Sequence, residues 1–122
     1  MPQFVKYEMP EETYSKVSDL LQKVVKNGGK VKAGVNEVTK MLERGNAKLV
    51  VLAEDVSPEE LLLHIPTLAD EKKIPYTYSK DRKSLGEACN LKVKASCIAV
   101  IIDGQAKKEL ETLVKEIQEL RK

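Results

Sequence analysis

Two uninterrupted apolar runs, Leu49–Ala53 and Cys97–Ile102, most constrain the fold of this chain. Runs without a polar face are expected of strands that are covered on both sides. The segments around them have apolar residues at the spacing of amphipathic helices. The alternation of helices with buried strands predicts an α/β protein, a three-layer α/β/α sandwich with a mixed, largely parallel sheet of four strands.

The bounds of these elements follow from residues that start and stop helices. The acids after Pro10 open a first helix, and the Gly-Gly pair at 28–29 ends it. Ser57, followed by Pro and two Glu, is the expected N-cap of a longer helix, and Asp81 is that of a short one. The strand at 30–32 is short and charged, which suits a sheet edge. We expect helices over residues 10–27, 34–45, 57–71, 81–88 and 105–122, and strands over residues 30–32, 49–53, 74–78 and 97–102.

The length and composition suit one compact domain over residues 1–122. Cys89 and Cys97 form no Cys-x-x-Cys motif and have no paired His. This disfavours metal binding and redox catalysis, and indicates two reduced, mostly buried thiols. The N-terminus lacks an apolar signal core, and the longest apolar run is far too short to span a bilayer. We therefore expect a cytoplasmic protein with no cofactor and no membrane partner.

Positive charge is concentrated in two segments, although the formal net charge is only +2. Residues 72–94 contain seven Lys and Arg against two acids, and residues 30–48 contain five against two. If the fold brings these segments together, they form one basic face suited to a polyanion. Ordinary solvated lysines explain the pattern equally well.

An enzyme is only a distant alternative for this sequence. The single His, His64, lies in an apolar helical stretch, where a packed or half-exposed His is far commoner than a catalytic one. Glu54 and Asp55 follow a buried strand and have the chemistry to bind Mg²⁺ or to act as acid and base. Adjacent carboxylates in such a place more often simply end the strand. No nucleotide-binding or nucleophile motif is present.

The helix over residues 34–45 has a polar face with unusual chemistry. Asn36, Lys40 and Arg44 form an i, i+4, i+8 row with Glu37 beside it. Lys can donate to O6 and N7 of guanine, a carboxylate can accept from its amino and imino groups, and Asn can do either. A purely solubilising face has the same pattern. Regular A-form RNA hides these edges, so such a site requires a bent or interrupted helix. The core stripe of this helix is Val35, Val38, Met41 and Leu42.

Seven short motifs occur in order along the chain: GVNEVTK (34–40), ERG (43–45), AKLV (47–50), AED (53–55), HIP (64–66), IPY (74–76) and LGEA (85–88). The series resembles the kink-turn-binding ribosomal protein family, most of all its archaeal large-subunit members. The resemblance runs without gaps from about residue 30 to residue 102. It implies an α/β/α sandwich that recognises kink-turns. These are RNA helices bent at a three-nucleotide bulge beside tandem sheared G·A pairs.

The resemblance also implies roles for individual residues. Asn36, Glu37 and Lys40 would contact the G·A guanines, the backbone at 34–35 would approach the RNA closely, and Arg44 would hold phosphate. Apolar residues of a loop around position 92 would pack against the bulged nucleotides. The residues expected to bind RNA are Gly34, Val35, Asn36, Glu37, Lys40, Arg44, Leu61, Arg82, Leu91, Lys92 and Val93.

The sequence departs from the family pattern at a few of these positions. Arg82 follows Asp81 where relatives have Lys after Ser, so Lys80 or Lys83 can share its contact. Lys94 stands where relatives often have Pro, which suggests a less rigid loop. A further departure, Val35 in place of a small Thr or Ala, is expected to be tolerated.

The partners implied by the resemblance are RNAs and the proteins bound to the same RNAs. They are rRNA of the large subunit, box C/D and H/ACA guide RNAs, and the RNA of ribonuclease P. The expected function is RNA binding without catalysis, in association with the ribosome. The alternative is a protein-interaction adaptor of the same fold that does not bind RNA.

Overall fold

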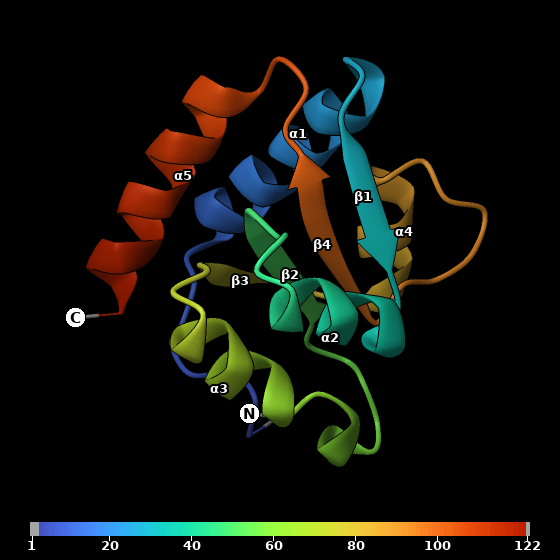
Figure 1. The fold of residues 1–122 in the computed structure, drawn as a ribbon, viewed down its shortest axis with the longest axis vertical. Helices are drawn as coiled ribbons and strands as arrows, with labels where there is room; N and C mark the ends of the chain where they lie inside the picture. The colour runs from blue at the N-terminus through green and yellow to red at the C-terminus, as the bar shows by residue number, and fades with distance from the viewer. Residues whose placement is uncertain (1–2, 122) are drawn as a thin grey trace.

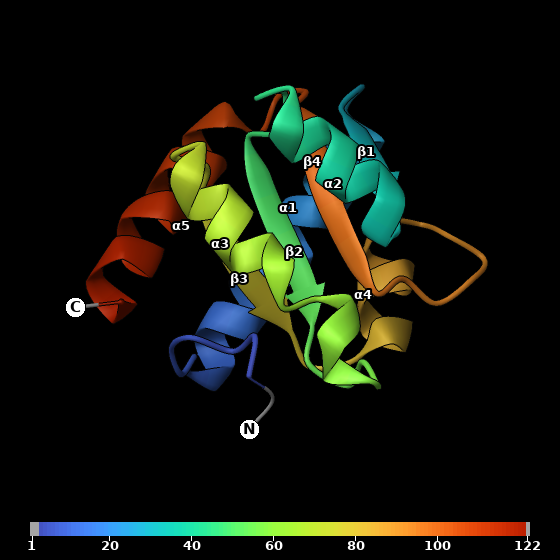
Figure 2. The same cartoon turned by 60° about the horizontal axis from the view of Figure 1, so that its bottom comes forward.

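The computed structural model describes residues 3–121, with helices on both faces of a four-stranded sheet (Figure 1). Helices α1, α4 and α5 cover one face, and α2 and α3 cover the other (Figure 2). The three-layer α/β/α sandwich is therefore confirmed. The elements are α1 (Glu11–Lys26), β1 (Lys30–Ala33), α2 (Val35–Glu43), β2 (Leu49–Ala53), the 3-10 turn η1 (Glu59–Leu61), α3 (His64–Glu71), β3 (Tyr76–Ser79), α4 (Arg82–Ala88), β4 (Cys97–Ile102) and α5 (Lys107–Leu120).

The sheet is mixed, in the order β1-β4-β2-β3, and β1 lies at an edge as expected. The expectation of a largely parallel sheet is wrong. Strand β4 runs antiparallel to both of its neighbours, and only β2 and β3 are parallel. A continuous apolar run indicates that both faces of a strand are covered. It does not indicate the direction of the strand, because a covered antiparallel strand needs the same apolar residues as a covered parallel one.

The core lies between the sheet and the two helical layers. All five residues of β2 are buried, as are the first four of β4. On α2, Val38, Met41 and Leu42 point into the core, whereas Val35 is only partly buried. Both thiols are free and buried, and burial raises the pKa of each to about 12. Within residues 3–121, no helix combines the length and the apolar character needed to cross a membrane.

The helix expected over residues 57–71 forms only in its second half. Ser57 is not an N-cap, Pro58 is extended, and the 3-10 turn η1 precedes α3, which begins at His64. The reason is Pro66. In a helix starting near residue 58, its ring would clash with the carbonyl group four residues earlier, and a backbone hydrogen bond would be lost. Because α3 starts at His64, Pro66 falls in the first turn, where its missing N–H group costs nothing.

The third strand begins two residues later than expected because Pro75 cannot donate to a sheet.

Beyond the free side of β3 lies the N-terminal segment, which the sequence pattern did not indicate. The hydroxyl of Tyr78 donates to the carbonyl oxygen of Phe4 at 2.7 Å, and accepts from the backbone N–H of Lys6 at 2.9 Å. Phe4 is fully buried. This segment therefore packs over the aromatic side chains of β3.

Candidate nucleic-acid interface

Most of the expected RNA-binding residues lie around one end of the sheet, and Arg44, at the far end of α2, is the exception. The start of α2, the turn η1 and the loop after α4 surround that end in Figure 2. Three backbone hydrogen bonds tie these segments together: Gly34 N–H to Cys97 O at 3.0 Å, Ala53 N–H to Ser96 O at 2.9 Å, and Ala95 N–H to Arg82 O at 3.1 Å. The start of α2 and the loop around residues 91–94 thus meet at this end. The expected single basic face forms only in part, because Lys30 lies beside Ile102 and Lys48 pairs with Asp103 at the opposite end of the sheet.

Gly34 makes the sharp change of direction from β1 into α2. Its φ of 97° lies where side chains are strained, so glycine suits this position. A Cβ atom built there meets nothing within 4 Å, which means that the backbone faces open space. The carbonyl oxygen of Gly34 accepts from the N–H of Val38 at 2.9 Å and so closes the first turn of α2. A ligand can therefore approach this helix start closely.

The polar row of α2 is exposed as expected. Glu37 and Lys40 lie one helical turn apart and form an ion pair of 3.6 Å, with side chains 46% and 57% exposed. Asn36 is exposed at the start of the same face. Arg44 is the C-cap of the helix, about 12 Å along the axis from Asn36 at 1.5 Å per residue. The first three side chains are therefore grouped, and Arg44 stands apart from them.

Two aspartates hold the start of α4. Asp81 is its N-cap, as expected, and accepts from the backbone N–H of Ser84 at 2.6 Å. That hydrogen bond lowers the pKa of Asp81 below its usual value. Asp55, from the end of β2, accepts from the backbone N–H of Arg82 at 2.9 Å. The same Asp55 oxygen lies 3.5 Å from Nε of Arg82. The role of Asp55 in holding Arg82 was not visible in the sequence, because the two residues are distant in the chain.

The loop between α4 and β4 is braced against α4. Its Leu91 N–H donates to Gly86 O at 2.9 Å, and the carbonyl group of Val93 lies where a side chain on Gly86 would stand. Val93 is 71% exposed at the tip, as an RNA contact requires. Leu91 is instead half buried and packs against the core. The resemblance implies that Leu91 covers the bulged nucleotides, but its contact with the core leaves only part of the side chain available for that role.

Cations border this loop. Lys83, Lys92 and Lys94 line a hollow of about 270 Å³ beside the exposed tip, and Glu87 is the acid that lies with them. Leu61, the other apolar residue expected at the RNA, ends η1 and is 47% exposed. Positive charge and exposed apolar surface thus adjoin at this end of the sheet.

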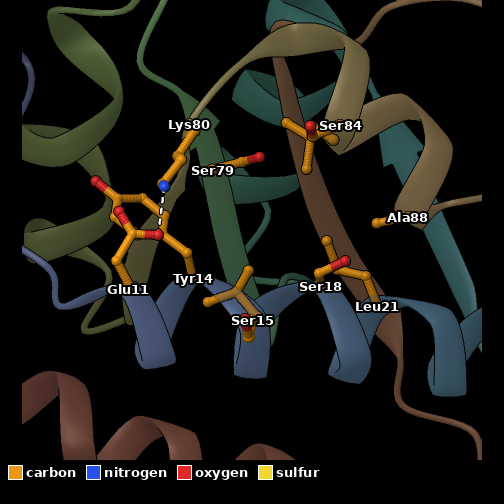
Figure 3. A pocket seen from close by; sticks show the side chains of 11 residues that line it. Glu11, Tyr14, Ser15, Ser18, Leu21, Ser79, Lys80, Ser84 and Ala88 are labelled. Atoms are coloured by element: carbon orange, nitrogen blue, oxygen red, sulfur yellow. Dashed lines mark hydrogen bonds and ion pairs between the residues drawn. The ribbon is translucent and has the colours of Figure 1, made fainter.

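Lys80 is drawn away from this surface toward α1 (Figure 3). Its ammonium group pairs with Glu11 and lies 5.4 Å from the ring centre of Tyr14. Together these side chains border a separate pocket of about 220 Å³ between α1 and α4, lined mainly by serine and aliphatic side chains. Of the two lysines that were expected to share the role of Arg82, Lys83 is therefore the better placed.

The adjacent carboxylates after β2 have separate structural partners. Glu54 accepts a hydrogen bond from the phenol of Tyr14, whose pKa rises through burial and through the negative charge of Glu54. Asp55 is bound to Arg82. His64 is exposed, and its Nε2 lies 2.9 Å from Oγ1 of Thr39, joining α3 to α2. Within residues 3–121, no cluster of three or more His, Cys, Asp or Glu side chains has the arrangement of a metal site.

The fold and this polar end of the sheet define a class of small α/β/α sandwich domains. The chain belongs to the ribosomal protein L7Ae/L30e/S12e/Gadd45 family, whose model matches residues 15–110. A solved structure, described as the Giardia lamblia 15.5kD RNA binding protein, has a TM-score of 0.89 to this chain at 27% sequence identity. The alignment covers 98% of each chain. The family resemblance predicted from the motifs is thus confirmed.

Proposed function

We propose that this protein binds RNA without catalysing a reaction, and that the RNA it selects is the kink-turn. The observation that carries the proposal is the grouping of Asn36, Glu37 and Lys40 on the exposed start of α2, opened by Gly34. The family membership and the likeness to a structure described as an RNA binding protein support it.

The chemistry of the three side chains suits guanines in sheared G·A pairs. Lys40 supplies N–H donors for O6 and N7, and the carboxylate of Glu37 accepts from the amino and imino groups. An exposed ion pair such as the one between them contributes only about 0–1 kcal/mol, so exchanging it for base contacts costs little. Guanine edges become reachable where the kink widens the groove, whereas a regular A-form helix keeps them hidden.

The mechanism follows from this selectivity. A protein that binds only the kinked conformer shifts the RNA population toward it. Val93 at the loop tip and Leu61 on η1 supply apolar surface for the bulged nucleotides, and Arg82 and Arg44 supply charge for phosphates. The kinked RNA and the protein together then form a platform for later proteins.

The same chemistry serves any RNA that contains a kink-turn. We propose that the protein is a cytoplasmic, ribosome-associated component of the large subunit. We further propose that it acts in box C/D and H/ACA guide-RNA particles and in ribonuclease P, where its partners are the RNA and neighbouring proteins.

The test is a gel shift with a kink-turn RNA and a matched duplex in which Watson–Crick pairs replace the G·A pairs. Wild-type protein should prefer the kink-turn. The double variant Glu37→Ala/Lys40→Ala should lose that preference while keeping its circular dichroism spectrum, since both side chains are exposed. Tight and selective binding by the double variant would place the site elsewhere. Failure of the wild type to bind either RNA would favour the adaptor alternative.

A further inference from the structure

Arg82 occupies a junction of three segments. Its backbone N–H donates to Asp55 at the end of β2, and its carbonyl oxygen accepts from the N–H of Ala95 in the loop before β4. Arg82 itself begins α4. One residue therefore links the end of β2, the start of α4 and the loop that carries Val93.

The side chain of Arg82 is oriented as well as linked. Its Nε is shielded from solvent and has no hydrogen-bond partner, yet it lies 3.5 Å from the carboxylate of Asp55. The side chain as a whole is still 43% exposed. Within residues 3–121, neither terminal amino group of Arg82 forms a hydrogen bond with the protein. These two groups are therefore free for an anion, and Asp55 fixes the direction of the guanidinium.

We propose that Asp55 is the positioning residue of the RNA surface, acting through Arg82. The inference rests on the proposed function, because the anion is the phosphate of the bound RNA. Arg offers donors in a rigid fork, so an oriented guanidinium loses less freedom on binding phosphate than a mobile one. The carboxylate also holds the backbone of Arg82, to which the loop is bonded through Ala95.

Charge alone predicts the opposite effect of Asp55 on RNA binding. A carboxylate beside a phosphate-binding surface repels RNA, so its removal should tighten binding if charge alone matters. If Asp55 orients Arg82, its removal should weaken binding. The sign of the change in affinity therefore separates the two roles.

The experiment uses fluorescence anisotropy on the full chain, with a kink-turn RNA and a straight duplex, at several KCl concentrations. In Asp55→Asn, the amide oxygen can still accept from the backbone N–H of Arg82, but the charge that attracts the guanidinium is gone. The matched control is Asp81→Asn, which removes the same charge from the same helix start and leaves Asp55 in place. Melting curves from circular dichroism report any effect on the fold.

We expect Asp55→Asn to bind the kink-turn roughly tenfold more weakly, as for loss of one charge-assisted contact. The slope of log affinity against log salt should shrink by about one. Asp81→Asn should bind as tightly as the wild type or slightly more tightly. Asp55→Glu, which keeps the charge, should recover part of the loss. In an Arg82→Ala background, Asp55→Asn should cause no further weakening.

Two results would overturn the role of Asp55 and leave the proposed function standing. One is wild-type selectivity for the kink-turn together with equal or tighter binding by Asp55→Asn. The other is an equal loss on Asp55→Asn with and without Arg82, which would make Asp55 a purely structural residue. A wild-type protein that does not prefer the kink-turn refutes the proposed function, and this inference falls with it.

Discussion

Replacing Glu37 by Gln tests the α2 surface sharply, because charge and hydrogen bonding predict opposite results. The change raises the formal net charge from +2 to +3, since one negative charge is removed, so general attraction to phosphates should increase slightly. A carboxylate accepts from both the amino and imino groups of guanine, whereas the amide of Gln turns a donor toward one of them. We expect kink-turn affinity to fall by about 1–3 kcal/mol, the usual scale of a good base contact.

The fold should tolerate this change. Glu37 is paired with Lys40 at 3.6 Å, and both side chains are about half exposed. Such a pair contributes at most about 1 kcal/mol. The favourable position of an acid in the first turn adds about 0.3–1 kcal/mol. The melting temperature should therefore fall by only several degrees, on the order expected for such losses in a chain of this size.

The assay is a fluorescence anisotropy titration with a labelled kink-turn and with a matched RNA that has Watson–Crick pairs in place of the G·A pairs. Glu43→Gln is the control, because it removes an equal charge from the exposed end of the same helix. Only Glu37→Gln should lose the preference for the kink-turn. If both variants bind the kink-turn equally well, the assignment of Glu37 to guanine is refuted.

Exposed side chains and buried thiols allow three further tests. Arg44→Ala should weaken binding to all RNAs to the same extent, and KCl titrations should show a smaller slope of log affinity against log salt. An altered sequence preference with an unchanged slope would contradict a phosphate role for Arg44. Val93→Asp should leave melting nearly unchanged but require more protein to bend an RNA carrying a dye pair, whereas Leu91→Asp should lower the melting temperature. Bending by Val93→Asp at the wild-type midpoint would exclude the loop tip from recognition. Burial raises the pKa of Cys89 and Cys97 to about 12, so neither is a thiolate at pH 8. Iodoacetamide should therefore label them only in denaturant. Rapid labelling of the folded protein would contradict their burial.

The layers of the fold were predictable because each depends on a local pattern. The stripe of α2 was confirmed at Val38, Met41 and Leu42, whereas Val35 is only partly buried. The apolar run of β2 was confirmed as a strand that is covered on both faces. Strand direction was not predictable in the same way. Whether β4 runs with or against β2 depends on how the chain connects them in space, and the residues of β4 suit either direction.

The misplaced start of α3 has a local cause that the sequence contains. The Ser-Pro-Glu-Glu stretch at 57–60 has the composition of a helix start, and Pro66 is incompatible with the middle of the helix it suggests. Giving the proline priority over the apparent cap would have placed the helix start within the first turn around Pro66, where the structure has it. The resulting short turn leaves Leu61 exposed, as the RNA contact implied by the family resemblance would need.

The rigidity of the loop around Val93 depends on residues outside the loop. By itself, the alternation of Leu91 and Val93 with lysines is that of an ordinary exposed segment, and Lys94 in place of Pro suggests flexibility. The carbonyl group of Val93 instead packs over the bare backbone of Gly86, and Arg82 bonds the loop while Asp55 holds Arg82. If the protein binds the kink-turn as proposed, a loop braced in this way should resist adapting to an unbent RNA, and its apolar tip should favour the conformer that fits it. We therefore expect the proposed selectivity for a bent RNA to depend as much on these supports as on the side chains proposed to face the bases.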